Sequence, residues 1–160
     1  MIKYLVMDVD GTLTDGKIYM GNDGEVMKAF SIKDGYGIHD ILIPAEITPI
    51  IITGRTSKIV ENRCHEIGIK EIYQGVSDKV EKLLSIINVL SSVAYMGDDI
   101  NDLLVMKLIK EAGGIVGCPA DAAKQVLEVG DYICSKNGGD GAVREFIEHI
   151  VDTKCIGDVL

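Results

Sequence analysis

Short, almost continuous apolar runs alternate along the chain with segments whose apolar residues recur every three or four positions. The first pattern predicts buried strands, and the second predicts amphipathic helices. The strands are expected at 2–8, 47–54, 71–75, 92–97, 114–117 and 131–134, and the helices at 35–43, 57–68, 78–90, 101–112, 120–128 and 141–151. Apolar strands that alternate with helices are typical of a mostly parallel sheet covered on both faces. The pattern therefore predicts an α/β fold, a Rossmann-like three-layer sandwich.

One segment interrupts this alternation shortly after the first strand. Residues 17–30 consist of two alternating arms around Asn22-Asp23-Gly24, which is typical of a β-hairpin. The sequence shows no internal repeat, low-complexity segment or linker, and its 160 residues suit one domain with a sizeable core. We therefore expect a single domain over 1–160, with the hairpin at about 17–30 and a C-terminal helix and tail at about 139–160.

The composition limits which binding partners and which cellular compartment are expected. The net charge of −9 argues against nucleic acid and anionic membranes as partners, because both attract a basic surface. No apolar run approaches the roughly 20 residues of a membrane span, and the first run ends at Asp8 without a signal-peptide cleavage pattern. We therefore expect a cytoplasmic protein. The absence of a CxxC pair argues against zinc and predicts free thiols at Cys64, Cys118, Cys134 and Cys155.

Polar residues gather where the predicted strands end. In open α/β sheets, ligands bind beyond the carboxyl ends of the strands. Four segments carry charged or hydroxyl groups to that edge: Asp8 and Asp10, then Thr53-Gly54-Arg55, then Lys79, and finally Asp98, Asp99 and Asp102. Segments far apart in the sequence are thus expected to form one site.

The carboxylates of this set favour a divalent cation. If Asp8, Asp10 and Asp98 converge, they resist ionising together unless a positive charge lies among them. Oxygen ligands suit Mg²⁺, and the sequence has no cluster of soft ligands that would suit zinc. One carboxylate is then free to attack an electrophile, as carboxylates that form aspartyl-phosphates do. Thr53 and Lys79 offer a donor and a positive charge for a phosphoryl group, so phosphoryl transfer is the predicted chemistry.

These motifs together resemble those of the haloacid dehalogenase (HAD) superfamily of aspartate-based phosphatases. The stretches DVDGTLTDG, ITGR and GDDIND, with a lysine at position 79, stand in the superfamily's order. The resemblance implies a phosphoric monoester hydrolase that uses Mg²⁺. Members usually carry a cap domain, but only the hairpin interrupts the early part of this chain. A capless member is therefore expected, whose site is shielded by oligomerisation.

The resemblance also implies a role for each motif residue. Asp8 would be the nucleophile and a metal ligand. Asp10 would bind the metal through its main-chain carbonyl, protonate the leaving alcohol and then deprotonate the attacking water. Thr53 and Lys79 would hold the phosphoryl oxygens, and Asp98 would complete the Mg²⁺ site. Two further carboxylates would support the metal ligands from behind or orient Lys79: Asp99 and Asp102.

Nearly the whole chain resembles one family within this superfamily, the phosphatases of 3-deoxy-D-manno-octulosonate 8-phosphate (KDO 8-phosphate), a precursor of lipopolysaccharide. The stretches that carry the resemblance are DVDGTLTDGKIYM, FSIKDGYGIHDI, ITGRTSKIVENRCHEIGIKEIYQGVSDK, YMGDDINDL and NGGDGAVRE. The family implies a homotetramer whose hairpins and C-terminal segments line neighbouring sites. It also implies substrate contacts from Gly54, Arg55 and Arg63, and from Arg144 within residues 137–145.

Other readings remain open. His39 and Asp140 depart from the family pattern, which leaves phosphatases of 2-keto-3-deoxynononate 9-phosphate or N-acylneuraminate 9-phosphate as alternatives. A catalytically silent binding subunit is an alternative of a different class. The acidic motifs also suit a nucleotidyltransferase or a receiver domain, but the chain has no glycine-rich nucleotide loop near its start. Its third strand ends in Tyr73-Gln74-Gly75, where a receiver needs an aspartate.

Overall fold

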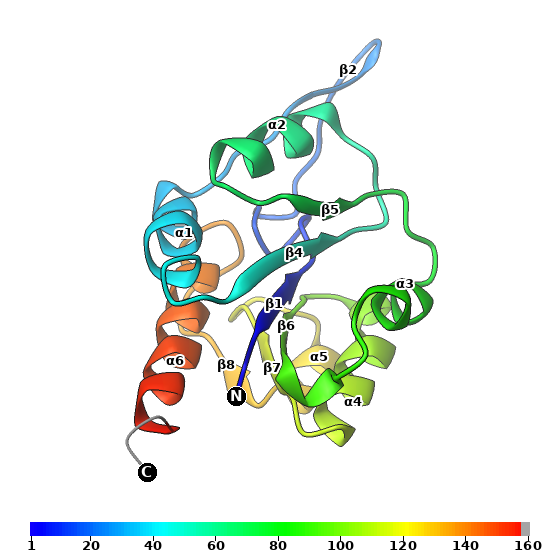
Figure 1. Ribbon diagram of the computed structural model, residues 1–160. Coiled ribbons are helices and arrows are strands. Elements are labelled where there is room, and N and C mark those ends of the chain that lie inside the picture. The colour runs from blue at the N-terminus through cyan, green and yellow to red at the C-terminus, as the bar shows by residue number, and fades with distance from the viewer. Residues whose placement is uncertain (158–160) are drawn as a thin grey trace.

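The computed structural model describes residues 1–157 and is built on a six-stranded sheet (Figure 1). The strand order is β5-β4-β1-β6-β7-β8, and every neighbouring pair is parallel. The strands are β1 (Tyr4–Met7), β4 (Thr48–Ile52), β5 (Glu71–Tyr73), β6 (Val93–Met96), β7 (Ile115–Cys118) and β8 (Tyr132–Ile133). In register, Val6 of β1 pairs with Ile50 on one side and Tyr95 on the other. The parallel α/β sheet predicted from the apolar pattern is confirmed.

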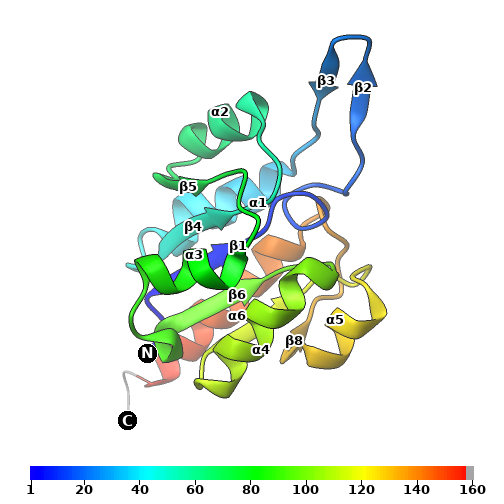
Figure 2. The same ribbon diagram turned by 90° about the vertical axis from the view of Figure 1, so that its right-hand side faces the viewer.

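Helices cover both faces of the sheet and complete three layers (Figures 1 and 2). On one face, Leu5 and Met7 pack in a core with a π-helix (Gly37–Leu42), α2 (Lys58–Glu66) and α6 (Ala142–Gly157). On the other face, Val6 packs with α3 (Lys79–Ile86), α4 (Leu103–Glu111) and α5 (Lys124–Val129). Successive residues of β1 thus serve opposite cores, as the pleat of a strand requires.

The predicted hairpin is present and projects from the body (Figure 2). Its strands are β2 (Tyr19–Gly21) and β3 (Gly24–Met27), which pair antiparallel. Three of its apolar side chains are more than half exposed: Met20, Val26 and Met27. Within residues 1–157, this two-stranded sheet is the only one besides the central sheet, and no cap domain is present.

Four helices differ from the predicted bounds by more than two residues. The helix expected at 78–90 ends as α3 at Ile86, because the backbone of Ile87 is extended. The helix expected at 35–43 begins as α1 (Ile32–Tyr36), where the Ser31 side chain accepts from Lys33 N–H, and it continues as the π-helix. The helix expected at 120–128 starts only at Lys124, because the preceding residues form a turn in which Ala122 N–H donates to Pro119 O. The last helix, α6, continues to Gly157 instead of ending near 151.

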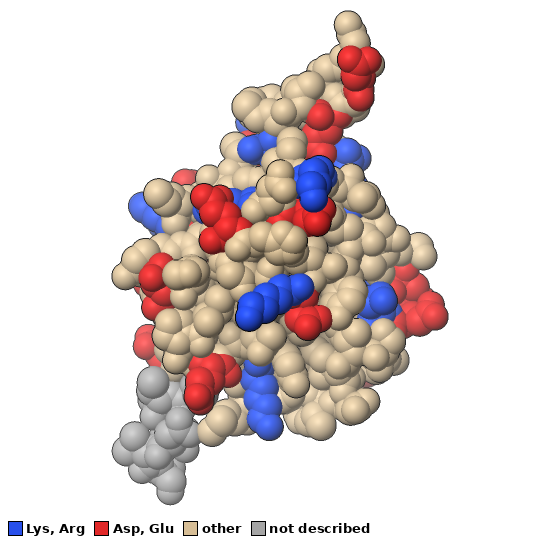
Figure 3. Space-filling model, turned by 45° about the horizontal axis from the view of Figure 1, so that its top comes forward, with Lys and Arg blue, Asp and Glu red and all other residues tan. Residues whose placement is uncertain are grey.

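Other expectations concern thiols, charges and membranes. Cys64, Cys118 and Cys134 are free and buried, as expected. The side chain of Cys155 and residues 158–160 of the expected tail lie outside the described part. On the face in Figure 3, basic side chains are interspersed with acidic ones. Among the described helices, none has the length and apolar character needed to cross a membrane.

Candidate active site

A cavity of about 180 Å³ lies at the carboxyl edge of the sheet. The loops that follow β1, β4 and β6 supply its lining: Asp8, Asp10, Thr53, Gly54, Arg55, Asp99 and Asn101. Six of these seven residues belong to the set predicted from the strand ends. The structure therefore brings three segments of that set together at one cavity.

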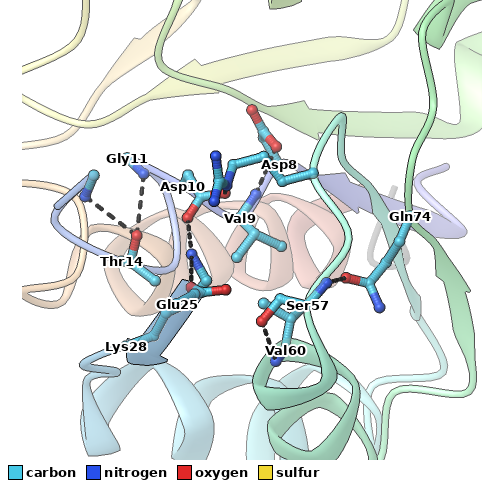
Figure 4. Close-up of polar contacts among 12 residues, drawn as sticks. Asp8, Val9, Asp10, Gly11, Thr14, Glu25, Lys28, Ser57, Val60 and Gln74 are labelled. Carbon is cyan, nitrogen blue, oxygen red and sulfur yellow. Dashed lines mark hydrogen bonds and ion pairs between the residues drawn. The ribbon is translucent and has the colours of Figure 1, made fainter. Parts of the chain in front are cut away.

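The first wall of the cavity is the loop after β1. Asp8 N–H donates to Met96 O at 3.0 Å, which extends the pairing of β1 with β6 by one residue. The Asp8 carboxylate accepts from Val9 N–H at 2.7 Å and is almost fully buried. The loop then turns back on itself, since the Thr14 hydroxyl accepts from Gly11 N–H at 3.3 Å (Figure 4). Asp8 is thus fixed by the end of a central strand.

The loop after β1 packs between the loop after β6 and the loop before α6. Gly11 has a φ of +91°, and a Cβ there would lie 1.9 Å from Oδ2 of Asp98, so glycine is required. The Thr12 hydroxyl donates to Asp98 Oδ1 at 3.0 Å. From behind, Gly139 N–H donates to Thr12 O at 3.1 Å, and a Cβ at Gly138 would lie 1.9 Å from Gly11 O. The loop before α6 therefore supports the loop after β1.

Lys79, the first residue of α3, lies between two aspartates. Its Nζ is 2.9 Å from Asp8 Oδ2 and 2.7 Å from Asp102 Oδ1, and its side chain is only 5% exposed. Burial lowers the pKa of Lys79, but the two carboxylates outweigh this effect and raise the pKa overall. The lysine therefore stays charged beside Asp8.

Asp102 is fully occupied by donors from the protein. Its Oδ1 accepts from Lys79 and from the Tyr95 hydroxyl, at 2.7 and 2.6 Å. Its Oδ2 accepts from the N–H groups of Asp98 and Asp99, at 3.0 and 3.2 Å. Asp102 is completely buried. Its position suits a residue that orients Lys79 and the loop after β6 better than a metal ligand.

Negative charge is crowded at this end of the site. Carboxylate oxygens of Asp8, Asp98 and Asp102 lie within 4.8 Å of one another. Burial, Asp102 and Asp8 together raise the pKa of Asp98 to about 7. Burial and Asp102 also raise the pKa of Asp8, although Lys79 acts in the opposite direction. One lysine does not compensate three carboxylates, so these residues fit a divalent cation bound by Asp8 and Asp98.

The Asp10 carboxylate is held from the hairpin side (Figure 4). Its Oδ1 accepts a hydrogen bond from Lys28 Nζ, and Arg55 Nε lies 3.9 Å from its Oδ2. The same Lys28 Nζ lies 2.8 Å from Glu25 Oε1. Burial lowers the pKa of Lys28, but its bonds to Asp10 and Glu25 outweigh this and raise it. Two basic and two acidic groups thus meet beside the cavity.

Two predicted substrate contacts lie elsewhere in the structure. Arg63 pairs with Glu66 at 2.9 Å, and its guanidinium lies over the Phe30 ring. Arg144 pairs with Glu148 at 2.6 Å, and its guanidinium lies over the Tyr36 ring. Neither arginine lines the 180 Å³ cavity. Their roles toward substrate stay predictions.

Sequence reasoning missed two side chains of the site. Tyr95 lies inside β6, where its ring reads as core and nothing reveals its hydrogen bond to Asp102. Lys28 lies in a hairpin arm, where a lysine is normally solvated. The only signal in the sequence was the alternation of apolar and polar residues in that arm, and this alternation does not predict which lysine points inward.

Comparisons with known proteins define the class first. No family model matches the chain. A solved structure from Legionella pneumophila, described as a HAD superfamily (subfamily III A) hydrolase, is 36% identical with a TM-score of 0.81 and covers 94% of this chain and 82% of that one. Together with the fold and the aspartate loop after β1, this likeness defines a HAD-type hydrolase.

Two further relatives specify the family. The chain is 45% identical over 148 residues to the KDO 8-phosphate phosphatase KdsC of Escherichia coli K12, covering 90% of this chain and 76% of the relative. The crystal structure of KDO 8-phosphate phosphatase from Moraxella catarrhalis, in complex with magnesium, phosphate and KDO, is 37% identical with a TM-score of 0.86. It covers 99% of this chain and 94% of that one. The chain belongs to the KDO 8-phosphate phosphatase family.

Proposed function

We propose that this protein is a Mg²⁺-dependent phosphatase that converts KDO 8-phosphate into KDO and phosphate. The observation that carries the proposal is the buried Asp8 carboxylate, which lies beside Lys79 at a cavity that Asp10 and Thr53 also line. The family membership supports the substrate, since a relative with the same fold binds magnesium, phosphate and KDO.

The chemistry requires two steps at phosphorus. In the first step, an oxygen of Asp8 forms a bond to phosphorus while the bond from phosphorus to the sugar oxygen breaks, and Asp10, which is protonated in the enzyme–substrate complex, gives its proton to that oxygen. In the second step, a water molecule attacks the phosphorus and gives a proton to Asp10. Phosphate leaves and the Asp8 carboxylate is restored. Thr53 and Lys79 hold the phosphoryl oxygens throughout.

The cation belongs to the acidic end of the site. Asp8 and Asp98 would hold it, together with the main-chain carbonyl of Asp10, while Asp99 and Asp102 support them. When bound, Mg²⁺ supplies positive charge that neutralises the phosphoryl oxygens. Without it, burial and the neighbouring carboxylates raise the pKa of Asp98 to about 7, and burial and Asp102 raise the pKa of Asp8.

A substrate panel tests the activity. Phosphate release is measured with Mg²⁺ on KDO 8-phosphate, the nine-carbon keto-deoxy sugar-acid phosphates, hexose phosphates and a chromogenic aryl phosphate. We expect a clear preference in kcat/KM for KDO 8-phosphate, loss of activity with EDTA, and a loss of at least about 1,000-fold in Asp8→Asn. A preference for a nine-carbon substrate would keep the chemistry and replace the substrate. No turnover at all would favour the silent binding subunit.

We also propose that the protein acts as a cytoplasmic homotetramer in which hairpins cover neighbouring sites. The exposed Met20, Val26 and Met27 support this, because apolar side chains on a projecting hairpin favour burial in an interface. Light scattering after gel filtration should give four chains for the wild type and fewer for the double variant Met20→Glu with Val26→Glu. A monomeric wild type would overturn the proposal.

The tail is better tested by substitution than by truncation. Ala142, Val143, Phe146 and Ile147 of α6 are completely buried, so removal of the chain from Gly138 onward would destroy the core. If Arg144 contacts the substrate of a neighbouring site, Arg144→Ala should raise the KM for KDO 8-phosphate and leave that for an aryl phosphate unchanged. An equal KM in both proteins would remove Arg144 from the site.

A further inference from the structure

Lys28 is the most unusual residue of the hairpin. The two residues before it, Val26 and Met27, are more than half exposed, yet the Lys28 side chain is 0% exposed. A lysine is rarely buried unless its charge is paired, because the loss of hydration is costly. Lys28 meets this cost with two carboxylates, those of Asp10 and Glu25 (Figure 4).

The two oxygens of Asp10 are in different situations. Lys28 Nζ donates to Oδ1, while Oδ2 has Arg55 Nε at 3.9 Å, which is beyond hydrogen-bond distance. The residue also lines the cavity. One oxygen is therefore anchored, and the other remains available for proton transfer.

Lys28 is in turn held in place by residues in the body of the protein. Glu25 pairs with Lys28, and the Ser57 side chain and Arg55 also interact with Glu25. Ser57 is the N-cap of α2, where its side chain accepts from Val60 N–H, and its own N–H donates to Gln74 Oε1 at 2.8 Å. Polar groups therefore follow one another from Asp10 through Lys28 and Glu25 to the start of α2, and from there to the residue after β5.

We propose that Lys28 is a positioning residue for proton transfer: it holds Oδ1 of Asp10 so that Oδ2 faces the oxygen that leaves phosphorus. The inference rests on the proposed function, since it assigns a residue to the protonation of the leaving alcohol. A fixed carboxylate is effective because proton transfer requires hydrogen-bond distance and orientation. Lys28 acts through Asp10 and does not itself touch the substrate.

A comparison of two leaving groups distinguishes the positioning role of Lys28 from a purely structural role. A sugar alkoxide needs a proton as it leaves, whereas a nitrophenolate leaves with little help. Release of the alcohol or phenol is measured in single turnovers with enzyme in excess and Mg²⁺ present, on KDO 8-phosphate and on p-nitrophenyl phosphate. In Lys28→Met, the ratio of the sugar rate to the aryl rate should fall at least about tenfold. Lys28→Arg should restore the ratio to within about threefold of wild type.

The matched control is Lys58→Met. Lys58 also pairs with a carboxylate three residues away, Glu61 at 2.9 Å, but its side chain is 73% exposed and lies on the outside of α2. Its ratio should equal that of the wild type. Each ratio comes from one preparation, so a misfolded fraction cancels, and Lys28→Gln provides a second variant if Lys28→Met does not fold.

The outcomes are distinguishable. A ratio in Lys28→Met that falls less than about tenfold, or equal losses on both substrates, would overturn the role of Lys28 while the phosphatase activity stands. A wild-type enzyme that cleaves neither substrate would overturn the proposed function, and the role of Lys28 with it.

Discussion

Two lysines are buried near the cavity, and their surroundings differ. Lys79 begins α3 and lies between Asp8 and Asp102 in the body of the protein. Lys28 follows β3 and lies between Asp10 and Glu25 at the base of the hairpin. In both cases, burial lowers the pKa of the lysine and the carboxylates raise it by more. Both lysines are therefore charged.

The difference lies in the balance of charge around each lysine. Lys79 faces a group of three crowded carboxylates, and the pKa of Asp98 rises to about 7 there. Around Lys28, Arg55 adds a second positive charge. Burial raises the pKa of Glu25, but Lys28, Ser57 and Arg55 together lower it overall. The first region lacks positive charge and therefore suits a cation. In the second region, the positive charges of Lys28 and Arg55 match the negative charges of its carboxylates, so no further cation is needed.

The largest effect that follows from this comparison is expected for Lys79→Met. Without the lysine, the pKa of Asp8 rises further and the phosphoryl group loses a partner, so single-turnover rates should fall at least about 100-fold. The loss should be equal for KDO 8-phosphate and p-nitrophenyl phosphate, because Asp8 attacks both. The loss of one partner from a buried pair should also cost about 3–5 kcal/mol in the free energy of unfolding.

The same measurement sharpens the contrast with Lys28. A Lys79→Met variant whose sugar-to-aryl ratio falls as far as that of Lys28→Met would show that the two lysines do not serve different steps. Thermal unfolding of Lys79→Met, with Lys58→Met as the exposed control, verifies that the variant is folded at the assay temperature.

A smaller effect is expected for Glu25→Gln. Lys28 keeps Asp10 as its partner in this variant but loses the charge that holds it from the other side. The single-turnover rate on KDO 8-phosphate should fall about threefold, with the aryl rate unchanged. If Glu25→Gln instead equals wild type on both substrates, the brace between the hairpin and Ser57 has no part in positioning Asp10.

A third buried site extends this comparison: it is a carboxylate that pairs with no lysine among the described residues. Asp34 is 1% exposed, and its Oδ1 accepts from Arg144 N–H at 2.9 Å near the start of α6. Burial raises its pKa from 3.8 to about 6. The folded protein thus keeps this proton up to about pH 6, while the unfolded chain releases it near pH 3.8. The resulting stabilisation is complete below about pH 4 and is lost as the pH rises through 6.

Asp34→Asn should remove this pH dependence. The shift corresponds to about 3 kcal/mol at about 1.4 kcal/mol per pH unit. The loss in the free energy of unfolding between pH 4 and pH 7 should therefore be smaller in the variant by up to that amount. Urea unfolding at both pH values measures it, and the other titrating groups cancel in the difference between the two proteins. Parallel pH profiles would contradict the raised pKa of Asp34.

Much of the fold and of the catalytic loop follows from local patterns. Apolar runs mark the strands, and the rule that ligands bind beyond strand ends brings Asp8, Thr53 and Arg55 to one cavity. The boundaries of α1 and α5 were less accessible, because a turn or a side-chain cap decides where such short helices begin. Predictions made one segment at a time succeed here because the end of each strand alone determines where the side chains that follow it lie.

Contacts between distant side chains were not accessible in this way. The inward turn of Lys28 depends on Asp10, Glu25 and the packing of the hairpin base, and none of these changes the pattern in the arm. The positions of Arg63 and Arg144 depend on partners along their own helices, Glu66 and Glu148, which compete with any role toward substrate. A sequence motif identifies the residue type without fixing its partner.

The loop before α6 has a consequence for the order in which the enzyme becomes active. Gly138 and Gly139 press against Gly11 and Thr12, although they are made far later during synthesis. The aspartate loop emerges from the ribosome first but lacks its rear support until this late segment has folded against it. Catalytic competence is therefore a property of the finished chain, and a nascent chain that ends before Gly138 carries the nucleophile without a working site.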